Sequence, residues 1–249
     1  MSGGRKAKAD KDQTIGILGG MGPGATADLF QKIIEETPAK SDQQHIPVVI
    51  VSDPRIPDRT EAILRGGPDP VPLMLKSAST CVRAGADFLI MPCNTAHYFH
   101  QEIQNGLSIP LLHMMEEVAD HLRRAYPEIR RLGLLATTGT VQSGLYQDAF
   151  SAANLAVELP EAHDQEAVME GIYGAEGVKS GGYEMPNRVF RQVSESLIER
   201  GAEAIIAGCT EIPLALHPED VGGAVLIDPT RILAQAAVRK ARGDRPEGA

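Results

Sequence analysis

The sequence contains no tryptophan, few other aromatic residues, three cysteines and no apolar run of the roughly 20 residues that a membrane-spanning helix needs. An odd number of cysteines in a long chain does not indicate a disulfide framework, so we expect free thiols in a reducing compartment. The formal net charge of -9 argues against nucleic acid as a general partner, which requires a basic surface. The N-terminus is charged but lacks the apolar region of a secretory signal. We therefore expect a cytoplasmic protein with no nucleic-acid or membrane partner.

What the chain does have is typical of an α/β protein. It is 43% hydrophobic and contains 25 glycines. Short runs that are apolar on both faces alternate with helical patterns, which predicts mostly parallel sheets flanked by helices. Strands are expected at 14–18, 46–51, 110–114, 131–136, 156–159 and 225–227, and in the apolar runs before Cys93 and Cys209. Helices are expected at 25–37, 73–84, 96–105, 115–125, 165–173, 186–200 and 232–242, with long loops at 52–72 and 174–184.

Two pairs of similar stretches repeat at almost one offset. Gly16 in IGILGGMG and Gly133 in LGLLATTG lie 117 positions apart (133 − 16), and Cys93 in GADFLIMPCNT and Cys209 in GAEAIIAGCT lie 116 apart (209 − 93). The shared offset predicts two pseudo-symmetric, similar α/β domains with the active site in the cleft between them. We expect the first domain at 14–115 plus 221–242, the second at 116–220, and tails at 1–13 and 243–249.

The cysteines fall into two kinds. Cys81 lies among apolar neighbours in a predicted helix and is expected to be a small buried hydrophobe. Cys93 and Cys209 each end a strand and precede polar residues. Ligands bind beyond the carboxyl ends of parallel strands, and a thiol near the N-terminus of the next helix is expected to have a lowered pKa. These two thiols are therefore the candidate catalytic groups, one from each domain.

Several chemistries could use two facing thiols. Zinc would need two further ligands, and a redox disulfide would be expected to show a C-x-x-C motif. Neither a C-x-x-C motif nor a suitably spaced pair of histidines accompanies either cysteine. A pair of acid/base groups on opposite faces of one carbon fits best, because one thiolate would remove a proton and the opposite thiol would return one, inverting the centre. Asn94, Thr95 and Thr210 could then hold the carboxylate whose charge grows during the reaction.

The order of six motifs resembles the aspartate racemase branch of the cofactor-independent aspartate/glutamate racemase family. These motifs are IGILGGMGP, IPDRT, MPCNTAH, LLATTGT, GIY…VK and IIAGCTEIP. The resemblance covers residues 14 to 242. It implies racemisation of aspartate by Cys93 and Cys209 without PLP, another cofactor or a metal, and a homodimer. It also implies that Arg59 and Lys179 hold the side-chain carboxylate of the substrate. The other substrate-binding residues that it implies are Met21, Thr60, Asn94, Thr95, Thr137 and Thr210.

Three alternatives remain open from the sequence. The first is a racemase of the same family with broader aspartate/glutamate specificity, although Met21 and Glu211 both favour aspartate. The second is a non-catalytic amino-acid-binding protein on the same scaffold. The third is a dinucleotide-binding enzyme, since Gly20-x-Gly22-x-x-Ala25 follows a strand, but the next acidic strand end, Asp53, comes 28 residues after Ala25 rather than about 20. His97, four residues after Cys93, is expected to pack at a helix start, and the alternative is a base that helps to deprotonate Cys93.

Overall fold

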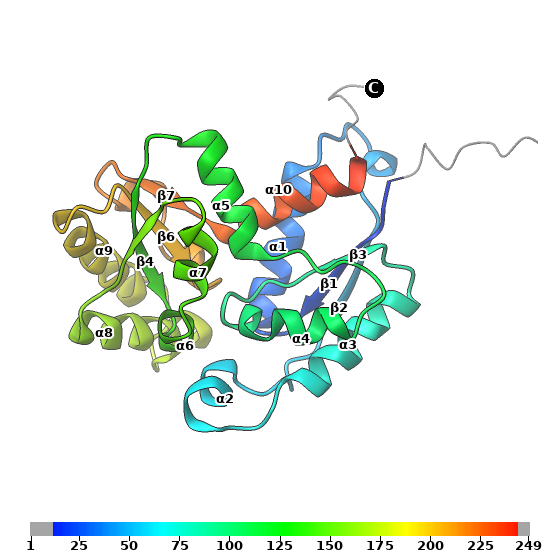
Figure 1. Ribbon diagram of the computed structural model, residues 1–249, viewed down its shortest axis with the longest axis horizontal. Coiled ribbons are helices and arrows are strands. Elements are labelled where there is room, and N and C mark those ends of the chain that lie inside the picture. Colours follow the sequence, from blue (N-terminus) through cyan, green and yellow to red (C-terminus); the bar gives the residue numbers. More distant parts are fainter. Residues whose placement is uncertain (1–11, 244–249) are drawn as a thin grey trace, which may run out of the picture.

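The computed structural model describes residues 12–243, which form two parallel sheets that lie side by side (Figure 1). The strands of the first sheet, in the order β2-β1-β3, are Val48–Ser52, Ile15–Gly19 and Phe88–Ile90. Those of the second, in the order β5-β4-β6-β7, are Ala156–Glu158, Arg131–Ala136, Ala204–Gly208 and Val225–Ile227. All pairings are parallel. The predicted α/β class with two flanked parallel sheets is confirmed.

Each sheet and the helices that flank it form one unit of the protein, and the helices divide between these two units. The first unit carries α1 (Pro23–Glu36), α2 (Arg59–Arg65), α3 (Val71–Arg83), α4 (His100–Asn105) and α10 (Pro229–Arg242). The second carries α5 (Met114–Ala125), α6 (Thr138–Gln142), α7 (Leu145–Ser151), α8 (Ala162–Tyr173) and α9 (Glu184–Glu199). Short 3₁₀ turns occur at η1 (Asp42–Gln44), η2 (Thr95–Phe99), η3 (Val178–Ser180), η4 (Ile212–Leu214) and η5 (Pro218–Asp220). Of the helices described, none is both long enough and apolar enough to pass through a bilayer.

One apolar core joins the two units. It contains residues of β1, such as Ile15, and of β4, such as Leu132, together with residues of α1, α5 and α10. Figure 1 shows these three helices between the two sheets, and α10 packs against both α1 and α5. Two smaller clusters cover the outer faces of the sheets. Because the units share a core, the relative position of their strand ends is set by packing.

The repeated glycines lie at equivalent places in the two central strands. A Cβ atom on Gly16 of β1 would overlap the side chains of Leu89 and Ala86 and would lie 3.2 Å from Cys81 Cβ in α3. A Cβ atom on Gly133 of β4 would lie 2.8 Å from Ile205 Cδ1 and 3.0 Å from Leu197 Cβ in α9. The missing side chain is what leaves room for α3 against the first sheet and for α9 against the second. The sequence repeat therefore reports a shared packing requirement.

Several sequence-based boundaries differ from the structure. The strand Val225–Ile227 pairs with β6 in the second sheet, so residues 225–227 do not join the first unit as predicted; the parallel ladder with Ala204–Ile206 holds them there. The strand expected at 110–114 is reduced to a single bridge between Leu111 and Leu89. The predicted 52–72 loop contains α2, capped by the Asp58 side chain. The predicted tails lie outside the described residues, apart from 12, 13 and 243.

Candidate active site

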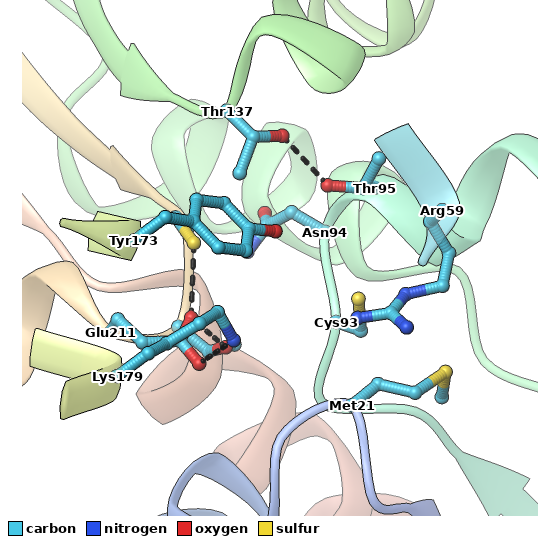
Figure 2. Close-up of a pocket in the computed structure, with 11 residues that line it drawn as sticks. Met21, Arg59, Cys93, Asn94, Thr95, Thr137, Tyr173, Lys179 and Glu211 are labelled. Carbon is cyan, nitrogen blue, oxygen red and sulfur yellow. Dashed lines mark hydrogen bonds and ion pairs between the residues drawn. The ribbon is translucent and has the colours of Figure 1, made fainter. Parts of the chain in front are cut away.

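One cavity between the units is lined by both candidate catalytic cysteines and by every predicted substrate-binding residue except Thr60 (Figure 2). Cys93 follows β3 and Cys209 follows β6, so the carboxyl ends of strands from both sheets meet here. The two thiols are about equally buried, with exposed fractions of 6% and 7%. The other predicted residues in the lining are Met21, Arg59, Asn94, Thr95, Thr137, Lys179 and Thr210.

Thr60 lies elsewhere. It lines a wider outer cleft, bounded by α2, α6 and α8, that shares Tyr173 with the cysteine cavity. Its Oγ1 atom is buried and has no hydrogen-bond partner within residues 12–243. Thr60 therefore neighbours the cavity without contributing to its lining.

Arg59 is placed by the start of α2. It is the first residue of that helix, is only 8% exposed, and its Nη1 donates to the carbonyl oxygens of Pro57 at 2.8 Å and Ile56 at 3.3 Å. Figure 2 shows the guanidinium beside Cys93. Burial alone would lower the pKa of Arg59, but the charges of Cys93 and Asp58 outweigh it and raise that pKa. The Nε–H group has no partner in the described part of the chain, so it is free to bind a ligand.

Cys209 has different neighbours. Its Sγ donates to Oε2 of Glu211 at 3.0 Å, and Oε1 of the same carboxylate pairs with Nζ of Lys179 at 2.5 Å. Burial, followed by the charge of Glu211, raises the pKa of the Cys209 thiol well above its usual value, while Lys179 acts in the opposite direction. The lowered pKa expected from the sequence is therefore wrong for Cys209. The helix that follows this cysteine is η4, a 3₁₀ turn of three residues, too short for a helix dipole to offset the carboxylate.

Two cavity-lining residues, Tyr173 and Glu211, were not predicted to bind substrate. The Tyr173 hydroxyl lies 3.4 Å from Oδ2 of Asp58 in the other unit, and Nζ of Lys179 lies 5.3 Å from the centre of the Tyr173 ring. Tyr173 occurs in the GIY motif and Glu211 follows the Cys-Thr pair, so both stand in motifs that were recognised. Their place in the lining depends on contacts between segments that are distant in the sequence.

The polar residues after Cys93 join the two units at the cavity itself. Oγ1 of Thr95 lies 2.9 Å from Oγ1 of Thr137 and 2.9 Å from Oγ1 of Thr140, and the last two oxygens are 3.2 Å apart. Asn94 accepts a hydrogen bond from the Tyr146 hydroxyl through Oδ1, which leaves its buried Nδ2 without a partner in residues 12–243. Asn94 therefore has a donor available for a ligand.

His97 contacts the backbone of the cysteine loop. Its Nδ1 lies 2.8 Å from the carbonyl oxygen of Cys93, and its ring packs with those of His100 and His113. It is not part of the cavity lining. Cys81 is buried in α3, where burial raises the pKa of its thiol to about 11.

The acid that a dinucleotide site would need is engaged elsewhere. Asp53 makes a two-pronged ion pair with Arg55, at 2.8 Å for each oxygen, and these hydrogen bonds lower its pKa to about 2. Gly20, in the glycine-rich turn, packs against the backbone of Asp53, where a Cβ atom would overlap it. This turn therefore packs the end of β1 against the end of β2. No three His, Cys, Asp or Glu side chains are grouped so as to hold a metal ion in the part of the chain described.

The fold and the cavity together define a class: an α/β enzyme of two similar units with a pair of buried thiols between them. A sequence profile of the Asp/Glu/hydantoin racemase family matches residues 18–237. The chain belongs to this family and is a racemase, an isomerase by reaction class. The family resemblance drawn from the six motifs is confirmed.

Individual relatives support the same assignment. The broad specificity amino-acid racemase RacX of Bacillus subtilis is 28% identical over 238 residues, which are 90% of this chain and 96% of RacX. The structure of Picrophilus torridus aspartate racemase matches with a TM-score of 0.81 and 30% identity, covering 94% of this chain and 96% of that one. A glutamate racemase of Desulforudis audaxviator is 31% identical over 170 residues, 64% of this chain and 56% of that protein. These three relatives are named for different substrates: a broad range of amino acids, aspartate and glutamate.

Proposed function

We propose that this racemase interconverts L- and D-aspartate and that Cys93 and Cys209 are its two proton carriers. The observation that carries the proposal is that two equally buried thiols, one from each unit, line a single cavity. A carbon bound between them would present one face to each sulfur. Inversion of a stereocentre by proton exchange needs this arrangement, since the proton must leave from one face and return to the other.

The reaction can be written without any other reactant. A thiolate on one cysteine forms an S–H bond with the α-proton as the Cα–H bond breaks, and the electron pair stays on the substrate as a carbanion. The S–H bond of the opposite cysteine then breaks as its proton forms the new Cα–H bond on the other face. Hydrogen-bond donors near the α-carboxylate would stabilise the charge that develops there. Asn94, whose Nδ2 is buried and unpartnered among the described residues, is suited to that role.

The preference for a dicarboxylic substrate rests on the two basic side chains of the lining. Arg59 has a buried Nε–H group with no partner in residues 12–243, and a guanidinium binds a carboxylate in two-pronged fashion. Lys179 carries the second positive charge, which Glu211 neutralises when no substrate is bound. A second carboxylate on the substrate can compete with Glu211 for Lys179. The homodimer, the cytoplasmic location and the lack of a cofactor stay predictions.

The test is incubation of the purified protein with L-aspartate, L-glutamate and L-alanine in D₂O. Polarimetry follows inversion, and mass spectrometry follows deuterium at Cα. We expect both signals for aspartate, weaker signals for glutamate and none for alanine. Comparable turnover of alanine would support the broad-specificity alternative, and binding of aspartate by calorimetry with no deuterium uptake would support the non-catalytic one.

A further inference from the structure

The two thiols are similar in burial but opposite in electrostatic surroundings. Cys93 lies beside the guanidinium of Arg59 (Figure 2). Cys209 instead donates a hydrogen bond to the carboxylate of Glu211. Burial does not distinguish them, because their exposed fractions are 6% and 7%. The charges nearest to the two thiols, by contrast, have opposite signs.

Glu211 is held firmly in place. It is 5% exposed, and its carboxylate receives three contacts: Lys179 Nζ at 2.5 Å, Cys209 Sγ at 3.0 Å and Thr210 Oγ1 at 3.1 Å. Gly22, from the first unit, comes close to the same group, since a Cβ there would lie 3.7 Å from both Glu211 Oε1 and Lys179 Nζ. The carboxylate thus lies at the junction of the two units with one oxygen directed at the thiol.

We propose that Glu211 is a positioning residue that keeps Cys209 protonated in the ligand-free enzyme, so that Cys209 is the proton donor and Cys93 takes the base role that the two-thiol reaction leaves. The proposal rests on the two-thiol function above. Removing the proton from Cys209 would place a thiolate 3.0 Å from a carboxylate in a buried site, where like charges repel strongly. At Cys93 the same ionisation would place the negative charge beside Arg59, where it is attracted.

This protonation pattern gives the catalytic cycle a starting point. Cys93 accepts the α-proton and becomes a thiol, and Cys209 gives its proton to the opposite face and becomes a thiolate. The free enzyme then returns to its starting form when Cys209 takes a proton from water and Cys93 releases one to water. Repulsion from Glu211 favours this return. The ionisable groups that face Cys209 in the cavity are Arg59, Cys93, Tyr173, Lys179 and Glu211.

Thiol alkylation in the ligand-free, full-length protein tests the proposal. Iodoacetamide reacts with the thiolate, and peptide mass spectrometry reports each cysteine separately from about pH 6 to about pH 10. In the unmodified protein we expect Cys93 to react first near neutral pH. In Glu211→Gln we expect the Cys209 profile to move down by about one pH unit, equivalent to a rate about tenfold higher at fixed pH. The rate at Cys93 in the same sample serves as an internal reference.

Two further variants give the expected effect a sign and a control. Lys179→Met removes the charge that opposes Glu211, so the Cys209 profile should move up instead of down. Glu166→Gln, on the exposed rim of the outer cleft, removes one negative charge of the same type and should leave both profiles unchanged. A Cys209 profile that does not move in Glu211→Gln overturns the proposal.

The test also holds if Glu211→Gln fails to fold, as judged by circular dichroism. The order of reaction in the unmodified protein then decides, and Cys209 reacting before Cys93 near neutral pH would overturn the proposal. Because no substrate is present, the outcome does not depend on which amino acid is racemised. Failure of the proposed function would be seen separately, as absence of deuterium uptake from every amino acid tested.

Discussion

The Tyr146 hydroxyl donates a hydrogen bond of 2.6 Å to Oδ1 of Asn94, and both side chains are buried. Tyr146 belongs to α7 of the second unit, whereas Asn94 directly follows Cys93 in the first. The residue next to one thiol is therefore anchored by the unit that carries the other thiol. In the proposed mechanism such a contact would keep the two thiols at a constant separation, on which proton transfer depends steeply.

Replacing either cavity cysteine should abolish racemisation. Cys93→Ala and Cys209→Ala each remove one of the two proton carriers, and the remaining thiol can still exchange the α-proton of one enantiomer. Polarimetry should show no inversion, while mass spectrometry in D₂O should show deuterium uptake from a single enantiomer. Cys81→Ala, which is buried in α3 outside the cavity, is the matched control and should keep racemase activity. Racemisation at the unmodified rate in either cavity variant would contradict the two-thiol mechanism.

Replacing Arg59 should weaken aspartate binding more than it slows the chemistry. Arg59→Lys keeps the charge but loses the planar fork, so KM should rise by about tenfold while kcat falls less. Initial rates by polarimetry over a range of aspartate concentrations give both constants. Arg55→Lys is the control, because Arg55 lies on the same connection but is exposed and paired with Asp53. An unchanged KM in Arg59→Lys would mean that this guanidinium does not contact the substrate.

The buried histidines should make the protein less stable in acid. Burial, and then the charge of a neighbouring histidine, lowers the pKa of His97 from 6.5 to about 3 and that of His113 from 6.5 to about 4. Between pH 6.5 and these lower values, the unfolded state binds a proton at each histidine and the folded state does not. The contribution of the neutral histidines to the free energy of unfolding is therefore fully present above about pH 6.5 and is lost as the pH falls.

The free energy of unfolding is expected to fall by about 1.4 kcal/mol per pH unit of acidification for each histidine. Urea unfolding at several pH values measures the free energy of unfolding in the unmodified protein and in His97→Gln. The variant should lose stability less steeply on acidification, by about one proton's contribution. Parallel curves for the two proteins would show that His97 does not titrate as described.

Adding a methyl group to the central strand of the first sheet should destabilise the fold. In Gly16→Ala the new Cβ would overlap Leu89 and Ala86, and overpacking of this kind costs about 1–3 kcal/mol. Gly24→Ala in α1 is the control, since no atom lies within 4 Å of the added Cβ. Thermal unfolding should show a lower Tm for Gly16→Ala and an unchanged or slightly higher one for Gly24→Ala. Equal Tm values would contradict the packing argument.

The parts of the fold that were predictable are those with a local signal. Parallel strands buried on both faces appear as short apolar runs, and the strand Arg131–Ala136 was predicted with its observed bounds. The sheet that β7 joins could not be predicted in this way. The sequence of its three residues does not indicate which strand they pair with. The pairing with β6 depends on where the chain runs after η5.

The site shows the same division. Cys93 and Cys209 could be found because each ends a recognisable strand within a repeated unit. Tyr146, which anchors Asn94, could not, because the contact joins residues 52 positions apart in different units. The sequence also did not show that Thr60 lines the outer cleft and not the cysteine cavity, since neighbouring residues within a helix point in different directions.

The amino-acid sequence by itself determined the α/β class, the racemase family and two candidate thiols at strand ends, because periodicity, ordered motifs and strand-end chemistry are local properties of the chain. Only the tertiary structure decided how the thiols differ. Glu211 lies two residues after Cys209, but the charge that balances it comes from Lys179, and the charge beside Cys93 comes from Arg59. Coulombic interactions depend on distance in space, so this asymmetry exists only once the two units are packed together.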